Sequence, residues 1–245
     1  MIKHLIGEFK VISAEFRKLD FQIVYILLSL CIIIFISFTV TNPSFYYKYI
    51  QKDFLNSRIY WLTSDGLVMF LIPILSIKFI FKKRLKDFGF QLGNYKYGLL
   101  TVLIFFAVMF PIVWIVSASD TFASTYPQGG PALRENIFLF FIFELSIIIY
   151  MIGWEFLWRG YTLFGLFNKF GYYAVFIQMI PFFILHKGKP DLELFASIVA
   201  GIILGIQAVR SKSFIYSWMI HSLVMISIDS VSVLRYIYKY YNILF

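Results

Sequence analysis

The chain has 245 residues, of which 60% are hydrophobic and only 14% charged, with a net charge of +9. A water-soluble domain of this length needs a far more polar surface, so the composition excludes a soluble catalytic module and favours a protein dissolved in lipid. The basic excess comes without a nucleic-acid-binding motif, which argues against a nucleic-acid partner. The single cysteine, Cys31, allows neither an intramolecular disulfide nor a cysteine metal site.

The N-terminal segment 1–20 is predicted to form an amphipathic helix on the cytoplasmic face of the membrane. Its apolar residues recur at helical spacing among charged ones: Leu5, Ile6, Phe9, Ile12, Phe16 and Leu19. The hydrophobic run that follows is too long for a signal-peptide core and is retained as a span. Residues 21–245 therefore form one membrane domain.

The remaining hydrophobic segments predict an all-α, polytopic integral membrane helix bundle of about seven spans. We place these spans at 21–41, 60–81, 97–118, 136–169, 171–187, 191–209 and 213–234. The fourth is too long for one straight crossing, so it tilts, kinks near Gly153 or begins at the interface. Lys and Arg are more frequent in the loops on the side of the N-terminus. This bias predicts that the protein lies in the cytoplasmic (plasma) membrane with its N-terminus on the inner side.

Ionisable residues inside spans are costly in lipid, so they are candidates for function. If the fourth and fifth spans form a hairpin turning at 168–171, Glu155 and His186 both lie roughly 21–24 Å from its turn. They can then meet and share a water molecule. By the same count His221 lies only about 12 Å deep, whereas Asp229, eight residues later, lies near 24 Å. On this count Asp229 is the better match in depth to Glu155 and His186, although tilt of the helices can shift either residue by several ångströms.

Each of these residues also has a purely structural interpretation. Glu155 can form an intrahelical pair with Arg159, four residues later, and Arg159 can then orient the carboxylate. His186 can be an interfacial residue at a helix end, and His221 a packing residue on an apolar helix. Glu193 can reach His186 from the next helix or be a solvated acid.

Three motifs on successive spans resemble the CPBP family of intramembrane proteases, which contains the type II CAAX prenyl endopeptidases and bacteriocin-processing homologues. The first reads Trp154-Glu155-Phe-Leu-Trp-Arg159, the second pairs Phe182 with His186, and the third begins at His221. The resemblance spans about residues 85–232. Two positions depart from the family pattern, because Trp154 replaces the first of two adjacent glutamates and Met225 replaces an Asn or Asp.

The resemblance implies an intramembrane endopeptidase acting on a membrane-associated protein or peptide. In this interpretation Glu155 and His186 activate water, His221 polarises the scissile carbonyl, and Arg159, Asp229 and Glu193 support them. Two histidines and a carboxylate also suit zinc, although a direct glutamate mechanism needs no metal. Two alternatives remain: an inactive relative acting in bacteriocin self-immunity or as a membrane scaffold, and a small transporter.

Overall fold

The computed structural model describes residues 1–240, and every regular element in that range is a helix. The longer helices are α2 (Phe21–Thr39), α4 (Phe54–Leu75), α5 (Tyr95–Val116), α8 (Ile137–Glu155), α11 (Asp191–Ser211) and α12 (Ile215–Tyr240). The shorter ones are α1 (Ile2–Phe16), α3 (Pro43–Tyr49), α6 (Asp120–Thr125), α7 (Ala132–Glu135), α9 (Leu163–Phe170) and α10 (Tyr173–Ile184). Two π-helical stretches, η1 (Ser76–Ile80) and η3 (Phe156–Thr162), and one 3₁₀ turn, η2 (Leu85–Phe88), complete the chain.

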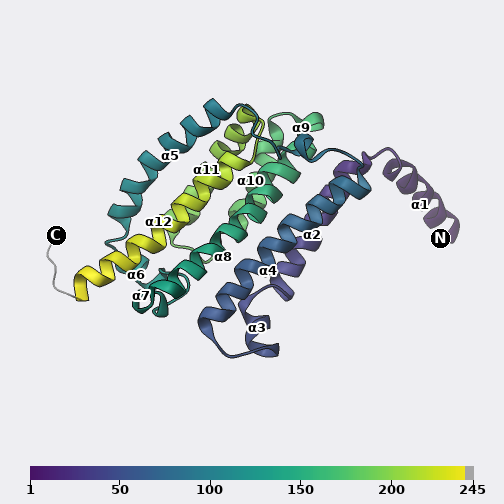
Figure 1. Ribbon diagram of the computed structural model, residues 1–245. Coiled ribbons are helices and arrows are strands. Elements are labelled where there is room, and N and C mark those ends of the chain that lie inside the picture. Colours follow the sequence, from purple (N-terminus) through teal and green to yellow (C-terminus); the bar gives the residue numbers. More distant parts are fainter. Residues whose placement is uncertain (241–245) are drawn as a thin grey trace.

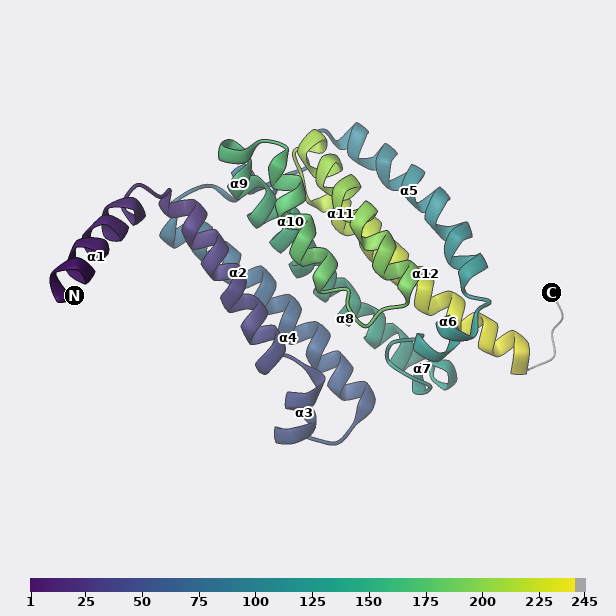
Figure 2. The ribbon, with the colours of Figure 1, turned by 180° about the vertical axis from the view of Figure 1, so that it is seen from behind.

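The described residues contain six helical segments long and apolar enough to cross a membrane, which confirms the predicted class of fold. They are Phe21–Thr39, Phe54–Ile80, Tyr95–Val116, Ile137–Phe170, Asp191–Ser211 and Ile215–Lys239. The predicted fifth span is shorter than expected, because α10 has only 12 residues. Such a helix rises about 18 Å, well below the thickness of the hydrocarbon layer. The chain turns back after α10 while α8 and α12 continue toward the other end of the bundle (Figure 2).

Polar side chains define where several helices begin. The carboxylate of Asp20 accepts a hydrogen bond from the Ile23 amide at the start of α2, and Asn136 accepts one from Leu139 at the start of α8. A side chain of this kind satisfies a backbone donor that has no partner within the helix. The apolar runs that follow supply the faces that pack in the bundle.

Helices α4 and α8 are in backbone contact at two glycines. A Cβ added at Gly153 would lie 2.0 Å from the carbonyl oxygen of Gly66, and one added at Gly66 would lie 2.7 Å from Tyr150 Cα. Small residues permit this close approach between membrane helices. The contact fixes α8 against α4 two residues before Glu155.

The bundle places α8 and α12 beside one another, with α2 and α4 on one side and α5 and α11 on the other (Figure 1). One end is closed by loop contacts: the Asn94 amide donates to Ser211 O, and the Phe214 amide donates to Gly89 O. Helix α1 extends away from the bundle in both views (Figures 1 and 2) and leaves Phe9 and Phe16 largely exposed. Its place on the cytoplasmic face stays a prediction.

Candidate active site

Glu155 is the last residue of α8 and is completely buried. Its Oε1 atom lies 3.0 Å from Arg159 Nη1 and 2.7 Å from His221 Nδ1 on α12. Arg159 is also completely buried, and its guanidinium group lies 4.0 Å from the centre of the Phe182 ring. The two oppositely charged residues therefore offset the cost of burying either charge alone.

The π-helical stretch η3 begins directly after Glu155 and carries Arg159. Within it the Thr162 hydroxyl donates to the carbonyl of Leu157, five residues earlier, as the wider turn requires. Gly160 allows close packing here, because a Cβ at this position would lie 3.1 Å from Phe88 O and closer still to the Phe156 ring. Short π-helical stretches inside α-helices are frequent at functional sites.

His186 lies in the turn between α10 and α11, and its ring faces that of His221. Its Nδ1 atom is 2.7 Å from the carbonyl oxygen of Phe182 one turn earlier. The two imidazole rings are nearly parallel, at an angle of 12°, with their centres 6.4 Å apart. The Phe182 ring packs against both imidazoles and over Arg159.

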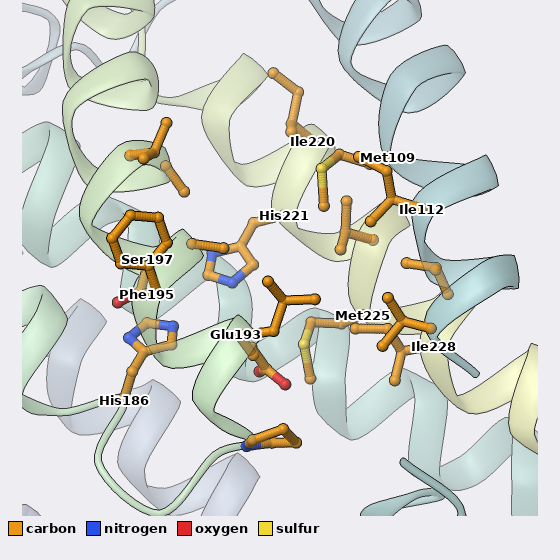
Figure 3. A pocket seen from close by; sticks show the side chains of 18 of the residues that line it. Met109, Ile112, His186, Glu193, Phe195, Ser197, Ile220, His221, Met225 and Ile228 are labelled. Atoms are coloured by element: carbon orange, nitrogen blue, oxygen red, sulfur yellow. The ribbon is translucent and has the colours of Figure 1, made fainter. Parts of the chain in front are cut away.

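Both imidazoles line a cavity of about 400 Å³ between α5, α11 and α12. In Figure 3, side chains of α5 and α11 face one another across the cavity, and His186 and His221 lie on the side away from α5. The walls are mainly apolar, as Met109, Ile112, Phe195, Ala200, Val224 and Ile228 illustrate. Phe195 is also largely exposed on the outer surface. The lining of the cavity therefore includes a side chain that is exposed on the outer surface of the bundle.

Trp154 and Met225, the two departures from the family motifs, both lie at this site. The Trp154 ring packs 5.7 Å from the centre of the His186 ring and 5.6 Å from that of Phe182. Met225 lines the cavity one turn after His221. An indole ring and a thioether thus take the places of two polar groups.

Asp229 and Glu193 lie in a second polar group, at the end of the cavity near the loop that joins α5 to α8. Oδ1 of Asp229 accepts a hydrogen bond from the Gln128 amide. Glu193 accepts a hydrogen bond from the Tyr126 hydroxyl and pairs with Lys189 at 3.5 Å. Burial, followed by the charge of Glu193, raises the pKa of the Tyr126 hydroxyl above its usual range. No motif or spacing in the sequence pointed to the contact between Tyr126 and Glu193.

The contact between His221 and Glu155 corrects the depth comparison made from the sequence. That comparison favoured Asp229 as the neighbour of Glu155, whereas the structure joins Glu155 to His221 and Asp229 to Gln128. The count assumed one straight α-helix from Glu155 to the turn at 168–171. The π-helical stretch interrupts that helix, so the straight-helix count does not hold between Glu155 and the turn.

Residues 135–226 match the family model described as type II CAAX prenyl endopeptidase, Rce1-like. This stretch is similar to an Rce1-like domain. It runs from the end of α7 into α12 and contains Glu155, Arg159, His186 and His221, while Asp229 lies just outside it. The match confirms the resemblance to the CPBP family of intramembrane proteases. No curated protein and no solved structure matches the chain.

The side chains of the Rce1-like domain do not fit a zinc ion. Zinc sites in proteins use three or four side-chain ligands. Among residues 1–240 no three His, Cys, Asp or Glu side chains come close enough together to hold a metal ion. Glu155 is completely buried and does not line the cavity, so of Glu155, His186 and His221 only the two imidazoles face it.

Proposed function

We propose that the protein is an intramembrane endopeptidase that hydrolyses a peptide bond of a membrane-associated protein or peptide. The observation that carries the proposal is the meeting of two imidazoles at one apolar cavity, with a buried carboxylate bonded to one of them. Imidazoles positioned in this way act as general acids and bases. The match to a family of CAAX-type intramembrane proteases supports the same reaction.

The cavity supports a substrate that arrives from the lipid phase. Its walls are apolar, and Phe195 and Val199 line it while also being exposed on the lipid-facing surface. A hydrophobic segment of a substrate therefore moves from apolar lipid into an apolar cavity. Its backbone carbonyl then lies beside His186 and His221. We place the protein in the cytoplasmic membrane with its N-terminus inside, following the distribution of Lys and Arg.

Glu155, His186 and His221 form the proposed catalytic group, supported by residues that hold the surrounding backbone and charge. Arg159 neutralises Glu155. Asp229 binds the backbone of the loop at Gln128, and Glu193 fixes Tyr126 at the rim of the cavity. These supporting contacts position elements around the cavity without reaching the two imidazoles.

The proposal is tested by comparing protein termini in cells that carry wild-type protein, His186→Ala or His4→Ala. His4 lies exposed on α1, so its replacement is the matched control and leaves cleavage unchanged. The His186→Ala variant is expected to lose at least one terminus that wild-type cells produce. Identical termini in wild type and a well-folded His186→Ala variant would exclude protease activity at this site.

One observation favours a second candidate, a non-catalytic relative acting in bacteriocin self-immunity or as a membrane scaffold. The ring of Trp154 packs against His186 where the family motif has a glutamate. In that case His186→Ala leaves both the termini and the cellular phenotype intact. The same experiment thus separates the two functions.

A further inference from the structure

We infer that His221 accepts the proton of the attacking water and that Glu155 is a positioning residue acting through His221. This inference rests on the proposed endopeptidase function and assigns roles within that site. It differs from the role expected from the sequence, in which Glu155 and His186 activate the water and His221 polarises the scissile carbonyl. Three features of the structure carry it: the access of each group to the cavity, the hydrogen bonds of each ring, and the position of Arg159.

Access to the cavity separates the two residues. The side chain of Glu155 is completely buried and does not line the cavity. The side chain of His221 is 14% exposed and lines it. A general base must come within hydrogen-bond reach of the proton that it removes. A water molecule in the cavity reaches His221 directly, whereas it reaches Glu155 only through the imidazole.

The hydrogen bonds define which ring nitrogen is free. The Nδ1 atom of His221 faces the Glu155 carboxylate, which only accepts hydrogen bonds, so Nδ1 carries the hydrogen. The Nδ1 atom of His186 likewise donates to the carbonyl oxygen of Phe182. In the neutral form of each ring the Nε2 atom is then an acceptor. Figure 3 shows both rings directed into the cavity and toward one another.

The spacing of the rings suits one water molecule. Their centres lie 6.4 Å apart, so one water oxygen with hydrogen bonds of about 2.8 Å can lie within reach of a nitrogen of each ring. A water molecule there donates one hydrogen to His221 and the other to His186. Its lone pairs then point away from both rings, toward a carbonyl carbon placed in the cavity.

The reaction balances with these groups alone. The water oxygen forms a bond to the carbonyl carbon, the π pair of the carbonyl moves onto its oxygen, and His221 Nε2 takes one water proton. The electron pair on that oxygen then restores the double bond as the carbon–nitrogen bond breaks, and the proton passes from Nε2 to the leaving amine. The second water proton passes from the new carboxylic acid to solvent or to His186. Glu155 accepts the Nδ1 hydrogen bond throughout and stabilises the imidazolium that forms for a moment.

Arg159 keeps Glu155 in place for this task. Its Nη1 atom holds the same Oε1 atom that His221 binds, so the carboxylate cannot turn away from α12 without losing both contacts. The guanidinium is closed off from the cavity by the Phe182 ring, which lies 4.0 Å from it. Arg159 therefore acts through Glu155 and does not touch the substrate.

The test is a double-mutant cycle on purified protein in phospholipid nanodiscs. The substrate is a peptide that spans the terminus identified in cells. His221→Ala and Glu155→Gln are each expected to lower kcat about 10²–10⁴-fold with little change in KM. Because Glu155 acts through His221, the double variant is expected to be no slower than His221→Ala within about threefold. A further loss in the double variant equal to that of Glu155→Gln alone would show that the carboxylate acts on the water directly, and would overturn the inference.

A second measurement needs no activity. The chain has three histidines, so ¹⁵N-histidine spectra of the whole protein contain three rings, and His4→Ala identifies the one on α1. His221 and His186 are expected to carry hydrogen on Nδ1 and none on Nε2. A hydrogen on Nε2 of neutral His221 overturns the inference whether or not the protein cleaves anything. Absence of cleavage by the wild type together with the expected spectra instead rejects the proposed function.

Discussion

Replacing Arg159 with Ala is expected to destabilise the protein strongly, because it leaves the Glu155 carboxylate buried without its cation. Both side chains are fully buried and lie 3.0 Å apart. Removing one partner of such a pair costs about 3–5 kcal/mol, since the remaining charge keeps its desolvation penalty and loses the attraction that offset it. Loss of the contact between the guanidinium and the Phe182 ring lowers the free energy of unfolding further. The free energy of unfolding is measured by denaturant titration in detergent micelles.

The structure supplies a matched control on the surface. Arg84 and Asp87 also pair at 3.0 Å, but their side chains are largely exposed, so Arg84→Ala is expected to change the stability little. Replacing both buried residues, as Glu155→Gln with Arg159→Met, is expected to recover most of the lost stability because no charge is left unpaired. If Arg159→Ala proves as harmless as Arg84→Ala, Glu155 is not held as a buried anion and its proposed role fails with it.

Three further predictions test the cavity, the helix contact and the metal. Ala200→Phe fills the cavity and is expected to reduce cleavage at least about tenfold, whereas Ile206→Phe, on the lipid face of the same helix, leaves the rate unchanged. Gly153→Ala forces α8 away from Gly66 and is expected to lower the free energy of unfolding by about 1–3 kcal/mol, while Gly7→Ala meets no atom within 4 Å and does not. The chelator 1,10-phenanthroline is expected to leave the cleavage rate of purified protein unchanged, because two imidazoles do not make a zinc site. A rate that falls with the chelator and returns with added zinc would contradict that expectation.

The helices were largely predictable because lipid imposes one simple requirement, a continuous apolar segment with its backbone hydrogen bonds satisfied internally. The predicted segment 21–41 became Phe21–Thr39, and 191–209 became Asp191–Ser211. The exception was the segment 171–187, where α10 ends at Ile184. The residues from His186 to Pro190 are polar or turn-forming, so the helix stops before them and is too short to span the hydrocarbon layer.

The partners within the site were harder to predict, because they depend on rotation about helix axes as well as on depth. The intrahelical pair of Glu155 with Arg159 followed from their spacing, and the structure confirms it. The hydrogen bond between His221 and Glu155 did not follow, because the count assumed a straight α-helix and a π-helical stretch interrupts it directly after Glu155. The cavity joins side chains from α5, α11 and α12, and no spacing within one segment reveals such a meeting.

The loss of the first motif glutamate and the proposed role of His221 explain one another. Adjacent helical residues point about 100° apart, so Trp154 faces Phe182 and His186 while Glu155 faces His221. With an indole ring at position 154, the described residues present no carboxylate of this motif to the cavity. His186 nevertheless keeps a defined tautomer through the carbonyl oxygen of Phe182, and His221 keeps one through Glu155. We therefore propose that hydrolysis at this site moves its proton through His221, the imidazole that a buried carboxylate supports.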